Sequence, residues 1–393
     1  MRSSKPLARL KILFNDRRFR SWCIQAFVLI ILACGIGYGV YNTAYNLQRA
    51  GVTTGFEFLG SRSGFDISQT LVEYSGNSSY SRALLVGILN TLLVSGLAIV
   101  SSTILGFSLG IIRLSPNWLM ARMAEGYTEM IRNIPLLLQI LFWYLAVLSP
   151  LPGPRQAYEW GDMFFLCNRG MQIPKLAQGQ NLMPLGIALI VAVLFSWVLI
   201  AWNRYRQRHT GQRFPAVLIS LGLIILLPLG VQMATGRSIQ FEMPVLRGFN
   251  FVGGITVLPE LIALWLALTL YSATFIGEYV RSGIMAVDSG QKEAAHALGH
   301  RGWTTYWLII IPQAMRATTP PLISQYLTLV KNSSLAVVIG YPDLVHVFAG
   351  TALNQSGQAV EIVCITMAVY LIISLVISLF MNWYNKKFAL RGL

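Results

Sequence analysis

The sequence predicts an all-α integral membrane protein with about eight transmembrane helices, and its composition and hydropathy pattern both indicate this fold class. Of the 393 residues, 55% are hydrophobic and only 11% are charged, whereas soluble domains have about 25% charged residues. The mean hydropathy is +0.58. The apolar residues also occur in long runs that charged residues, glycine or proline interrupt. A chain of this kind is expected to bury most of its surface in lipid.

Eight apolar runs have a length suited to a bilayer core of roughly 30 Å, which requires about 20 residues of helix. In chain order they are Trp22 to Tyr41, Ala83 to Ile112, Ile134 to Leu148, Leu185 to Trp202, Ala216 to Met233, Ile255 to Ile276, Thr318 to Gly340 and Val360 to Trp383.

The positive charges give the orientation of these runs. With the N-terminus inside, the cytoplasmic segments carry 21 lysine and arginine residues and the opposite segments carry 8. The remaining basic residue, Lys331, lies inside the seventh run. Because basic residues stay on the cytoplasmic side, both termini are predicted there, an N-in and C-in topology. The net charge of +15 thus comes from short topology signals, and it does not indicate a nucleic-acid partner.

The runs divide the chain into a predicted core with additions. Residues 1–80 hold a basic tail, a first span without a clean signal-peptide cleavage site, and an external segment rich in glycine and serine. Residues 81–385 hold the other spans, and within them 151–250 is interpreted as an insertion with an external loop and two extra helices. Residues 386–393 form a cytoplasmic tail. Without the additions, about five spans remain as the transmembrane core.

One polar stretch interrupts the apolar pattern, QKEAAHALGHRGWTTYWLIIIPQAMR at residues 291–316. Asp288 can cap a helix N-terminus, and Gln291 stands three residues later, where a capping box has its partner. Gly299 supplies the left-handed residue that ends a helix. These limits predict about ten helical residues, or roughly 15 Å, which is too short to span a membrane.

The residues alone leave two interpretations of this helix open. Its alanines would allow another protein to approach the backbone closely, and Glu293 offers a charged anchor at the rim. A second short piece from Thr304 is expected to end at Pro312, because proline cannot continue a helix without a kink, and it would join the helix stiffly to the next span. The alternative is a solvated connecting loop with no partner.

The spacing of this stretch resembles the EAA loop of ABC importer permeases. The matching residues are Glu293, Ala294, Ala295, Gly299, Ile309, Ile311 and Pro312. Leucine is usual in the family where Ile311 stands, which is a conservative departure.

Three further segments are similar to the polar amino-acid permease family, the histidine/glutamine type. They are AEGYTEMIRNIPLLLQILFWYL (124–145), ATFIGEYVRSGI (273–284) and LVKNSSLAVVIGYPDL (329–344). Together the matches extend over most of residues 81–385. The extra first span and the long insertion resemble the larger permease subunit of general L-amino-acid importers.

The resemblance implies a permease subunit with a type I ABC importer core. The importer would have broad specificity and would move L-amino acids, mainly polar ones, from periplasm to cytoplasm. The implied partners are a second permease chain in a heterodimer, two copies of a cytoplasmic ATPase, a periplasmic amino-acid-binding protein and membrane lipid. Residues 278–316 would form the coupling loop, and its ATPase-coupling residues would be Glu293, Ala294, Ala295, Gly299 and Pro312. The implied location is a bacterial inner membrane, which the chain crosses several times.

The chain itself is not expected to be an enzyme or to bind a cofactor. It contains no Gly-Lys dipeptide, so it lacks the G-x-x-x-x-G-K-[ST] phosphate loop, and ATP and Mg are expected in the partner ATPase. The alternative from another class is an ATPase-independent secondary amino-acid transporter or a channel. The GIGYG segment at 35–39 does not support a potassium filter, because it lies inside the first span and no pore helix precedes it.

Lys331 is the first candidate for the substrate path or gate. A charge inside a span costs a few kcal/mol on insertion scales, roughly 3, and marks a pathway or a buried pair. Asn332 and Ser333 follow it and could open polar groups toward a cavity, and the ammonium could meet the carboxylate of an amino acid. The alternatives are an ion pair with Glu278 or a lysine that reaches the membrane surface.

Three other charged residues are candidates for the same path or gate. Glu278 and Arg281 are three apart and share a helix face at the cytoplasmic end of the sixth span, so they form either a latch or an interfacial salt bridge. Arg132 precedes Pro135 and resembles the family's entry to a span, although a helix-start role is the simpler interpretation.

Neither histidine nor cysteine residues indicate a metal site. His296 and His300 are four apart, but Gly299 breaks the helix between them and no third ligand is in view. The four cysteines are scattered and lack metal-ligand spacing.

Overall fold

The computed structural model describes residues 17–49, 55–177, 183–211, 214–235 and 240–389. Seven helices in this part of the chain are long and apolar enough to cross a membrane, or eight if one bent pair is a single span. The predicted fold class is therefore confirmed. The predicted basic tail at 1–16, two residues of the basic turn at 212–213, and the chain end at 390–393 lie outside the described residues.

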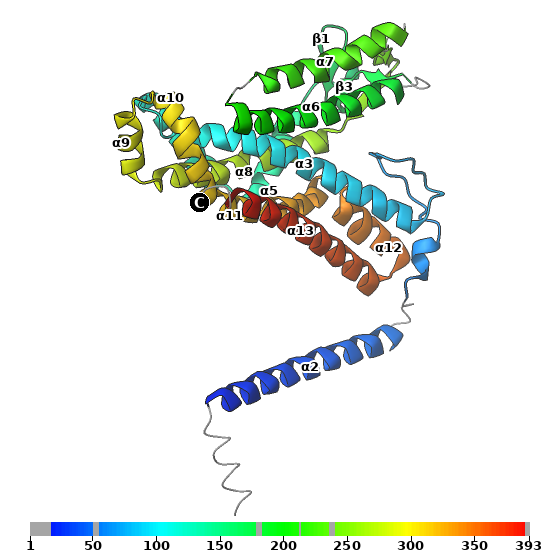
Figure 1. Cartoon of the computed structure of the whole chain (residues 1–393). Helices are drawn as coiled ribbons and strands as arrows, with labels where there is room; N and C mark the ends of the chain where they lie inside the picture. Colours follow the sequence, from blue (N-terminus) through cyan, green and yellow to red (C-terminus); the bar gives the residue numbers. More distant parts are fainter. Residues whose placement is uncertain (1–16, 50–54, 178–182, 212–213, 236–239, 390–393) are drawn as a thin grey trace, which may run out of the picture. The chain divides into compact units, whose positions relative to one another are not determined.

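The helices appear in order along the chain in Figure 1. They are α2 (Arg17–Arg49), α3 (Tyr80–Ile112), α4 (Trp118–Asn133), α5 (Leu136–Leu141), α6 (Met183–Thr210), α7 (Ala216–Thr235), α8 (Pro259–Met285), α9 (Ser289–Ala297), α10 (Gly302–Thr305), α11 (Ile311–Asn332), α12 (Leu353–Ser356) and α13 (Ala359–Ala389). Short 3-10 helices lie at Glu57–Gly60, Pro154–Gln156 and Ser333–Ile339, and π-helices at Phe142–Leu148, Tyr306–Ile310 and Val345–Ala352.

The chain forms two compact units. The first contains Met1–Ala124 and Ser272–Leu393, and the second contains Glu125–Tyr271. In the first unit, α11 packs against both α3 and α13. Two apolar clusters fill this unit. One contains Ile276, Val280, Ile284, Ile310, Ala314 and Leu322, and the other contains Tyr80, Leu344, Phe348, Ala352 and Ile362.

Glycines allow α3 and α8 to approach each other closely in the first unit. A Cβ atom on Gly110 would lie 2.7 Å from the carbonyl oxygen of Gly277, and one on Gly106 would lie 2.6 Å from Ile276. Two small residues four apart on one helix are the usual basis of close packing between membrane helices. The α3–α8 contact is therefore specified by the GFSLG segment at 106–110.

The second unit holds a helical hairpin of α6 and α7, which pack side by side (Figure 1). It also contains short strands, where the sequence predicted only an external loop. They are β1 (Tyr158–Trp160), β2 (Phe164–Cys167), β3 (Gly170–Ile173), β4 (Lys175–Leu176), β5 (Phe241–Glu242), β6 (Val245–Arg247), β7 (Asn250–Val252) and β8 (Ile255–Val257).

The strands form one antiparallel sheet in the order β1-β2-β3-β8 and two separate pairs, β4-β5 and β6-β7. Residues before and after the α6–α7 hairpin thus meet in one small β-structure. Gly170 has a φ of +111°, and a Cβ there would lie 2.2 Å from the carbonyl oxygen of Val257, so glycine is required where β3 and β8 meet. The predicted sixth span begins later than expected, at Pro259, because residues 255–257 form β8.

The predicted third run is present as Leu136–Leu148, and the helix Trp118–Asn133 precedes it with a bend of 101° between the two. One further predicted boundary was wrong. The short piece from Thr304 does not end at Pro312. A continuous stretch, Tyr306–Ile339, begins with a π-helix, and Pro312 lies in the first turn of α11, where a missing N–H removes no helical hydrogen bond.

Candidate functional site

The short helix α9 is the first part of the candidate site. The Asp288 side chain caps it by accepting the N–H of Gly290 at 2.7 Å. Gly299 follows the helix with a φ of +76°, in the left-handed region. The predicted limits of the helix are therefore confirmed. The predicted capping box is replaced by a different contact, because the Gln291 Oε1 accepts the Nε2 of Gln313 at 3.1 Å.

The exposed face of α9 carries three of the predicted coupling residues. Glu293, Ala294 and Gly299 are exposed. The side chain of Leu298, at the end of the helix, is 76% exposed, which gives this polar segment one large apolar contact group. Ala295 is only 1% exposed, so this alanine packs the helix inward and does not present a contact surface.

Two contacts tie α9 to the start of the following span. One is the hydrogen bond between Gln313 and Gln291. The other is a cation–π contact in which the Lys292 ammonium lies 5.8 Å from the centre of the Tyr306 ring. Near these contacts in the chain, Ile310 and Ala314 are buried in the apolar cluster that includes residues of α8. A displacement of α9 would therefore be carried to the base of α11.

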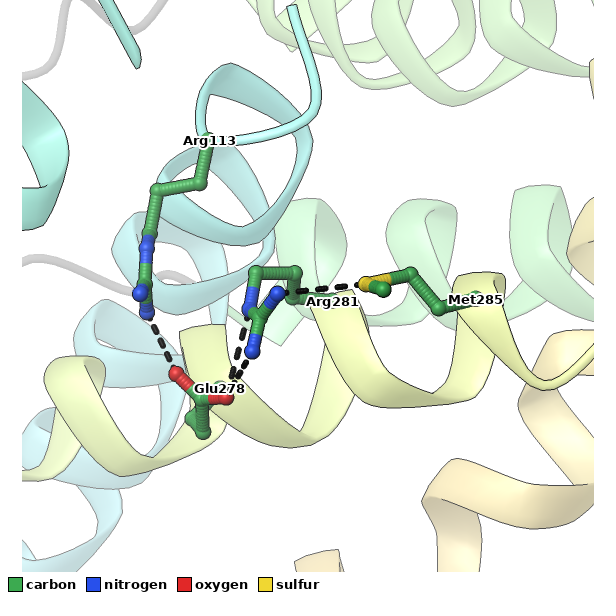
Figure 2. Close-up of polar contacts among 4 residues, drawn as sticks. All are labelled: Arg113, Glu278, Arg281 and Met285. Carbon is green, nitrogen blue, oxygen red and sulfur yellow. Dashed lines mark hydrogen bonds and ion pairs between the residues drawn. The ribbon is translucent and has the colours of Figure 1, made fainter. Parts of the chain in front are cut away.

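An ion-pair network joins the C-terminal ends of α3 and α8, and it contains the Glu278–Arg281 pair that the charge pattern suggested (Figure 2). The Glu278 carboxylate forms an ion pair with Arg113 at the end of α3. Its other oxygen accepts Nη2 of Arg281 at 2.7 Å. Arg281 also contacts the Met285 sulfur at 3.1 Å. Figure 2 shows the Glu278 carboxylate between the two guanidinium groups.

Sequence reasoning missed Arg113, although a signal existed. It is a lone arginine directly after the second apolar run. Its side chain is only 12% exposed, which is unusual for an arginine that serves only as a topology signal. The structure therefore assigns Glu278 to an ion pair with two arginines, and the alternative pairing with Lys331 was wrong.

The polar residues at the end of α11 and just after it lie in two environments. Lys331 is exposed on the unit surface, and Asn332 is half-buried. Ser333 is fully buried, and its hydroxyl donates to the Val330 carbonyl at 2.7 Å. Ser333 therefore faces the interior of its own unit and does not lie on the exposed surface that carries Lys331.

The exposed face of α11 differs from the exposed faces of α3, α6, α7 and α13, which carry large hydrophobic side chains. It runs along one side of the helix and consists of small or polar residues, namely Ala317, Pro320, Ser324, Thr328 and Lys331. The whole of α11 is described, and it exposes no large hydrophobic side chain. By contrast, α3 exposes Leu92, Val100 and Ile104. Lipid favours large apolar side chains, so this face of α11 has the composition of a surface against protein or water.

Arg132 lies in a different place from the one predicted. It is in the last turn of α4, so it ends a helix and does not begin one. A basic residue there complements the partial negative charge of the helix C-terminus. The Gln139 side chain stabilises the bend between α4 and α5. Its Nε2 donates to the carbonyls of Ile131 and Ile134, each at 2.9 Å.

The candidate spans, with the short capped helix α9 between two of them, define an integral membrane protein. Comparisons with known proteins identify its family as one of transport components. The family described as "Binding-protein-dependent transport system inner membrane component" matches residues 206–391. YhdX of Escherichia coli strain K12, named as an amino-acid ABC transporter permease, is 48% identical over 377 residues, which are 96% of each chain.

Two further relatives agree. The general L-amino acid transport system permease protein AapQ of Rhizobium johnstonii is 49% identical over 375 residues, 95% of this chain and 94% of AapQ. The glutamate/glutamine/aspartate/asparagine transport system permease protein BztB of Rhodobacter capsulatus is 40% identical over 414 residues, 98% of this chain and 97% of BztB. The chain belongs to the family of amino-acid ABC transporter permeases. This membership decides against the alternative of a secondary transporter or channel.

Proposed function

We propose that this chain is the permease subunit of an ATP-driven importer that moves polar L-amino acids of broad specificity across a bacterial inner membrane, from periplasm to cytoplasm. The observation that carries the proposal is the exposed helix α9, which bears the EAA motif and is tied to the base of α11. The names of the relatives AapQ and BztB support L-amino acids as the substrate class.

The proposed partners are inferred from two features of the chain: the sequence has no phosphate-binding loop, and helix α9 is exposed. The sequence contains no phosphate-binding loop, so ATP hydrolysis with Mg belongs to a separate ATPase, present in two copies. The surface that docks on it consists of Glu293 and Ala294 of α9 together with Leu298 and Gly299, which follow the helix. A second permease chain and a periplasmic amino-acid-binding protein complete the importer.

The substrate path is proposed to run along the exposed face of α11. This face lacks the large apolar side chains that lipid favours, and it ends at Lys331, which makes no ion pair within the described residues. An unpaired ammonium at membrane depth is costly unless it faces water or a partner. Lys331 is therefore proposed to meet the carboxylate that all amino acids share, with the half-buried Asn332 beside it.

The other candidates receive supporting roles in this proposal. Glu278 and Arg281 act with Arg113 as a latch that holds α3 to α8 next to the coupling helix. Arg132 and Ser333 support the fold, since Arg132 lies in the last turn of α4 and the Ser333 hydroxyl donates to the Val330 carbonyl of α11.

The test is co-purification followed by reconstitution. Tagged wild-type chain is expressed with the candidate ATPase, second permease and binding protein, and the purified complex is assayed for ATP hydrolysis with a panel of amino acids. The proposal expects all partners in the complex and stimulation by binding protein loaded with polar L-amino acids. A chain that purifies without an ATPase, or a complex stimulated equally by loaded and empty binding protein, would contradict it.

A further inference from the structure

Asn90 joins two parts of the chain that are far apart in the sequence. It lies in α3, about ten residues and roughly 15 Å from the start of the helix, and its side chain is fully buried. Its Nδ2 donates to the carbonyl of Gln69 at 2.9 Å and to the carbonyl of Pro342 at 2.8 Å. Both donors of one amide are thus used, each on a different segment.

The first of these segments is a loop at residues 61–79, which we call the outer loop. Its two limbs are bonded to each other. The N–H of Ser63 donates to the Ser78 carbonyl at 2.8 Å, and the N–H of Gly64 donates to the Gly76 carbonyl at 3.0 Å. The Ser63 and Tyr74 hydroxyls are also 2.8 Å apart. The outer loop is therefore built to move as a unit.

The second segment is the corner at residues 341–344, where the chain turns after the 3-10 helix Ser333–Ile339. The Tyr341 hydroxyl donates to the Asn90 carbonyl at 3.2 Å, and the Leu344 N–H donates to the Thr91 hydroxyl at 3.0 Å. Gly87 allows this contact, because a Cβ there would lie 3.0 Å from the Leu344 Cα. The corner is thus held on α3 by neighbouring residues.

The corner is connected to the proposed substrate path. The 3-10 helix that leads to it begins two residues after Lys331. The corner is followed directly by the π-helix Val345–Ala352. Phe348 of this helix lies in the same apolar cluster as Tyr80. A change in position of the corner would therefore move the segment that carries Lys331.

The buried amide of Asn90 has a cost beside its two hydrogen bonds. The Asn90 Oδ1 is buried and has no hydrogen-bond partner within the described residues. An unpaired buried acceptor costs free energy that an apolar side chain of similar size, such as leucine, would not incur. Leucine could not supply the two hydrogen bonds that join the outer loop and the corner.

We propose that Asn90 is a positioning residue that transmits movement of the outer loop to the corner and so to Lys331. The proposal rests on the proposed function, in which a soluble binding protein delivers substrate to the predicted external side, where the outer loop lies. Docking of that protein displaces the outer loop, and the shared amide moves the corner with it.

The first test uses Asn90→Leu in the complete reconstituted transporter. ATP hydrolysis is measured without binding protein and with saturating loaded binding protein. Loss of two buried hydrogen bonds is expected to reduce the stimulation by about tenfold while hydrolysis without binding protein is unchanged. Thr103→Val is the matched control, because it removes another bond from α3, to the Tyr326 hydroxyl at 2.8 Å, without touching the outer loop. The control is expected to keep its stimulation.

The second test needs no variant and applies if Asn90→Leu does not assemble. Amide hydrogen exchange is measured in the unmodified transporter with and without loaded binding protein. The amides of Ser63, Gly64 and Leu344 are expected to change together. A change confined to the outer loop would overturn the proposal, as would full stimulation of Asn90→Leu. An unmodified transporter that binding protein does not stimulate contradicts instead the proposed function itself.

Discussion

The Glu278 carboxylate on α8 pairs with the Arg113 guanidinium at the end of α3. Their side chains are 24% and 12% exposed, so the pair is largely removed from water. It lies a few residues beyond the close glycine contact of the same two helices. Together these two features fix the cytoplasmic end of α3 to the helix that leads into α9.

Replacement of Glu278 is expected to destabilise this junction. Glu278→Ala leaves Arg113 and Arg281 without their shared partner, and the apparent free energy of unfolding should fall by about 1–3 kcal/mol. Arg281→Ala should cost less, because Arg281 is 30% exposed and Glu278 keeps its pair with Arg113. The measurement is denaturant unfolding in mild detergent. Equal effects of the two substitutions would show that the Arg113 pair adds no stability to the junction.

The glycine contact predicts a difference between two glycines of the same helix. In Gly110→Ala the new methyl group would lie 2.7 Å from the Gly277 carbonyl oxygen, so the helices must separate, at a cost of about 1–3 kcal/mol. Gly96→Ala is the matched control, since no atom lies within 4 Å of its added Cβ, and it should be neutral or slightly stabilising. Thermal unfolding midpoints of both variants check this. A neutral Gly110→Ala would show that α3 and α8 are not in close contact.

Substitutions in α9 are expected to separate docking from folding. Glu293→Ala combined with Gly299→Ala removes the charged anchor and strains the left-handed residue by about 1 kcal/mol. The double variant should lose the ATPase on co-purification while its unfolding midpoint stays close to that of wild type. Gly302→Ala is the control, because Gly302 has no positive φ and open space around it, and it should retain the ATPase. Retention of the ATPase by the double variant would remove α9 from the docking surface.

Lys331 is expected to act in transport and not in docking. Lys331→Met keeps the length of the side chain but removes the charge proposed to meet the substrate carboxylate. Uptake should fall at least about tenfold, the scale of one charge-assisted hydrogen bond, while ATPase co-purification is unchanged. Thr328→Val, one turn earlier on the same face, should have a smaller effect. Unchanged uptake by Lys331→Met would take this residue off the path.

Local patterns predicted much of this molecule. Hydropathy located the spans, because each must cover the same bilayer thickness with apolar residues. Asp288 and Gly299 delimited α9, since capping depends on nearby residues. The EAA spacing predicts a docking role for this helix, because the motif residues lie close together in the chain and need no distant contact to be found.

What the sequence did not predict depends on contacts between distant residues. Arg113 meets Glu278 across 165 positions, and Asn90 meets Pro342 across 252, which no local pattern encodes. A polar Asn90 within an apolar run was nevertheless a signal that could have been used. The strands at 158–257 were missed because most have only two or three residues, and their pairing across the α6–α7 hairpin is a tertiary property.

The most direct test of the central claim is uptake of a labelled polar L-amino acid into vesicles that contain the complete transporter. The vesicles are compared with ATP inside, without ATP, and with the ATPase subunit omitted, always with loaded binding protein outside. Accumulation is expected only when ATP and the ATPase are both present. Accumulation by this permease without the ATPase would contradict it.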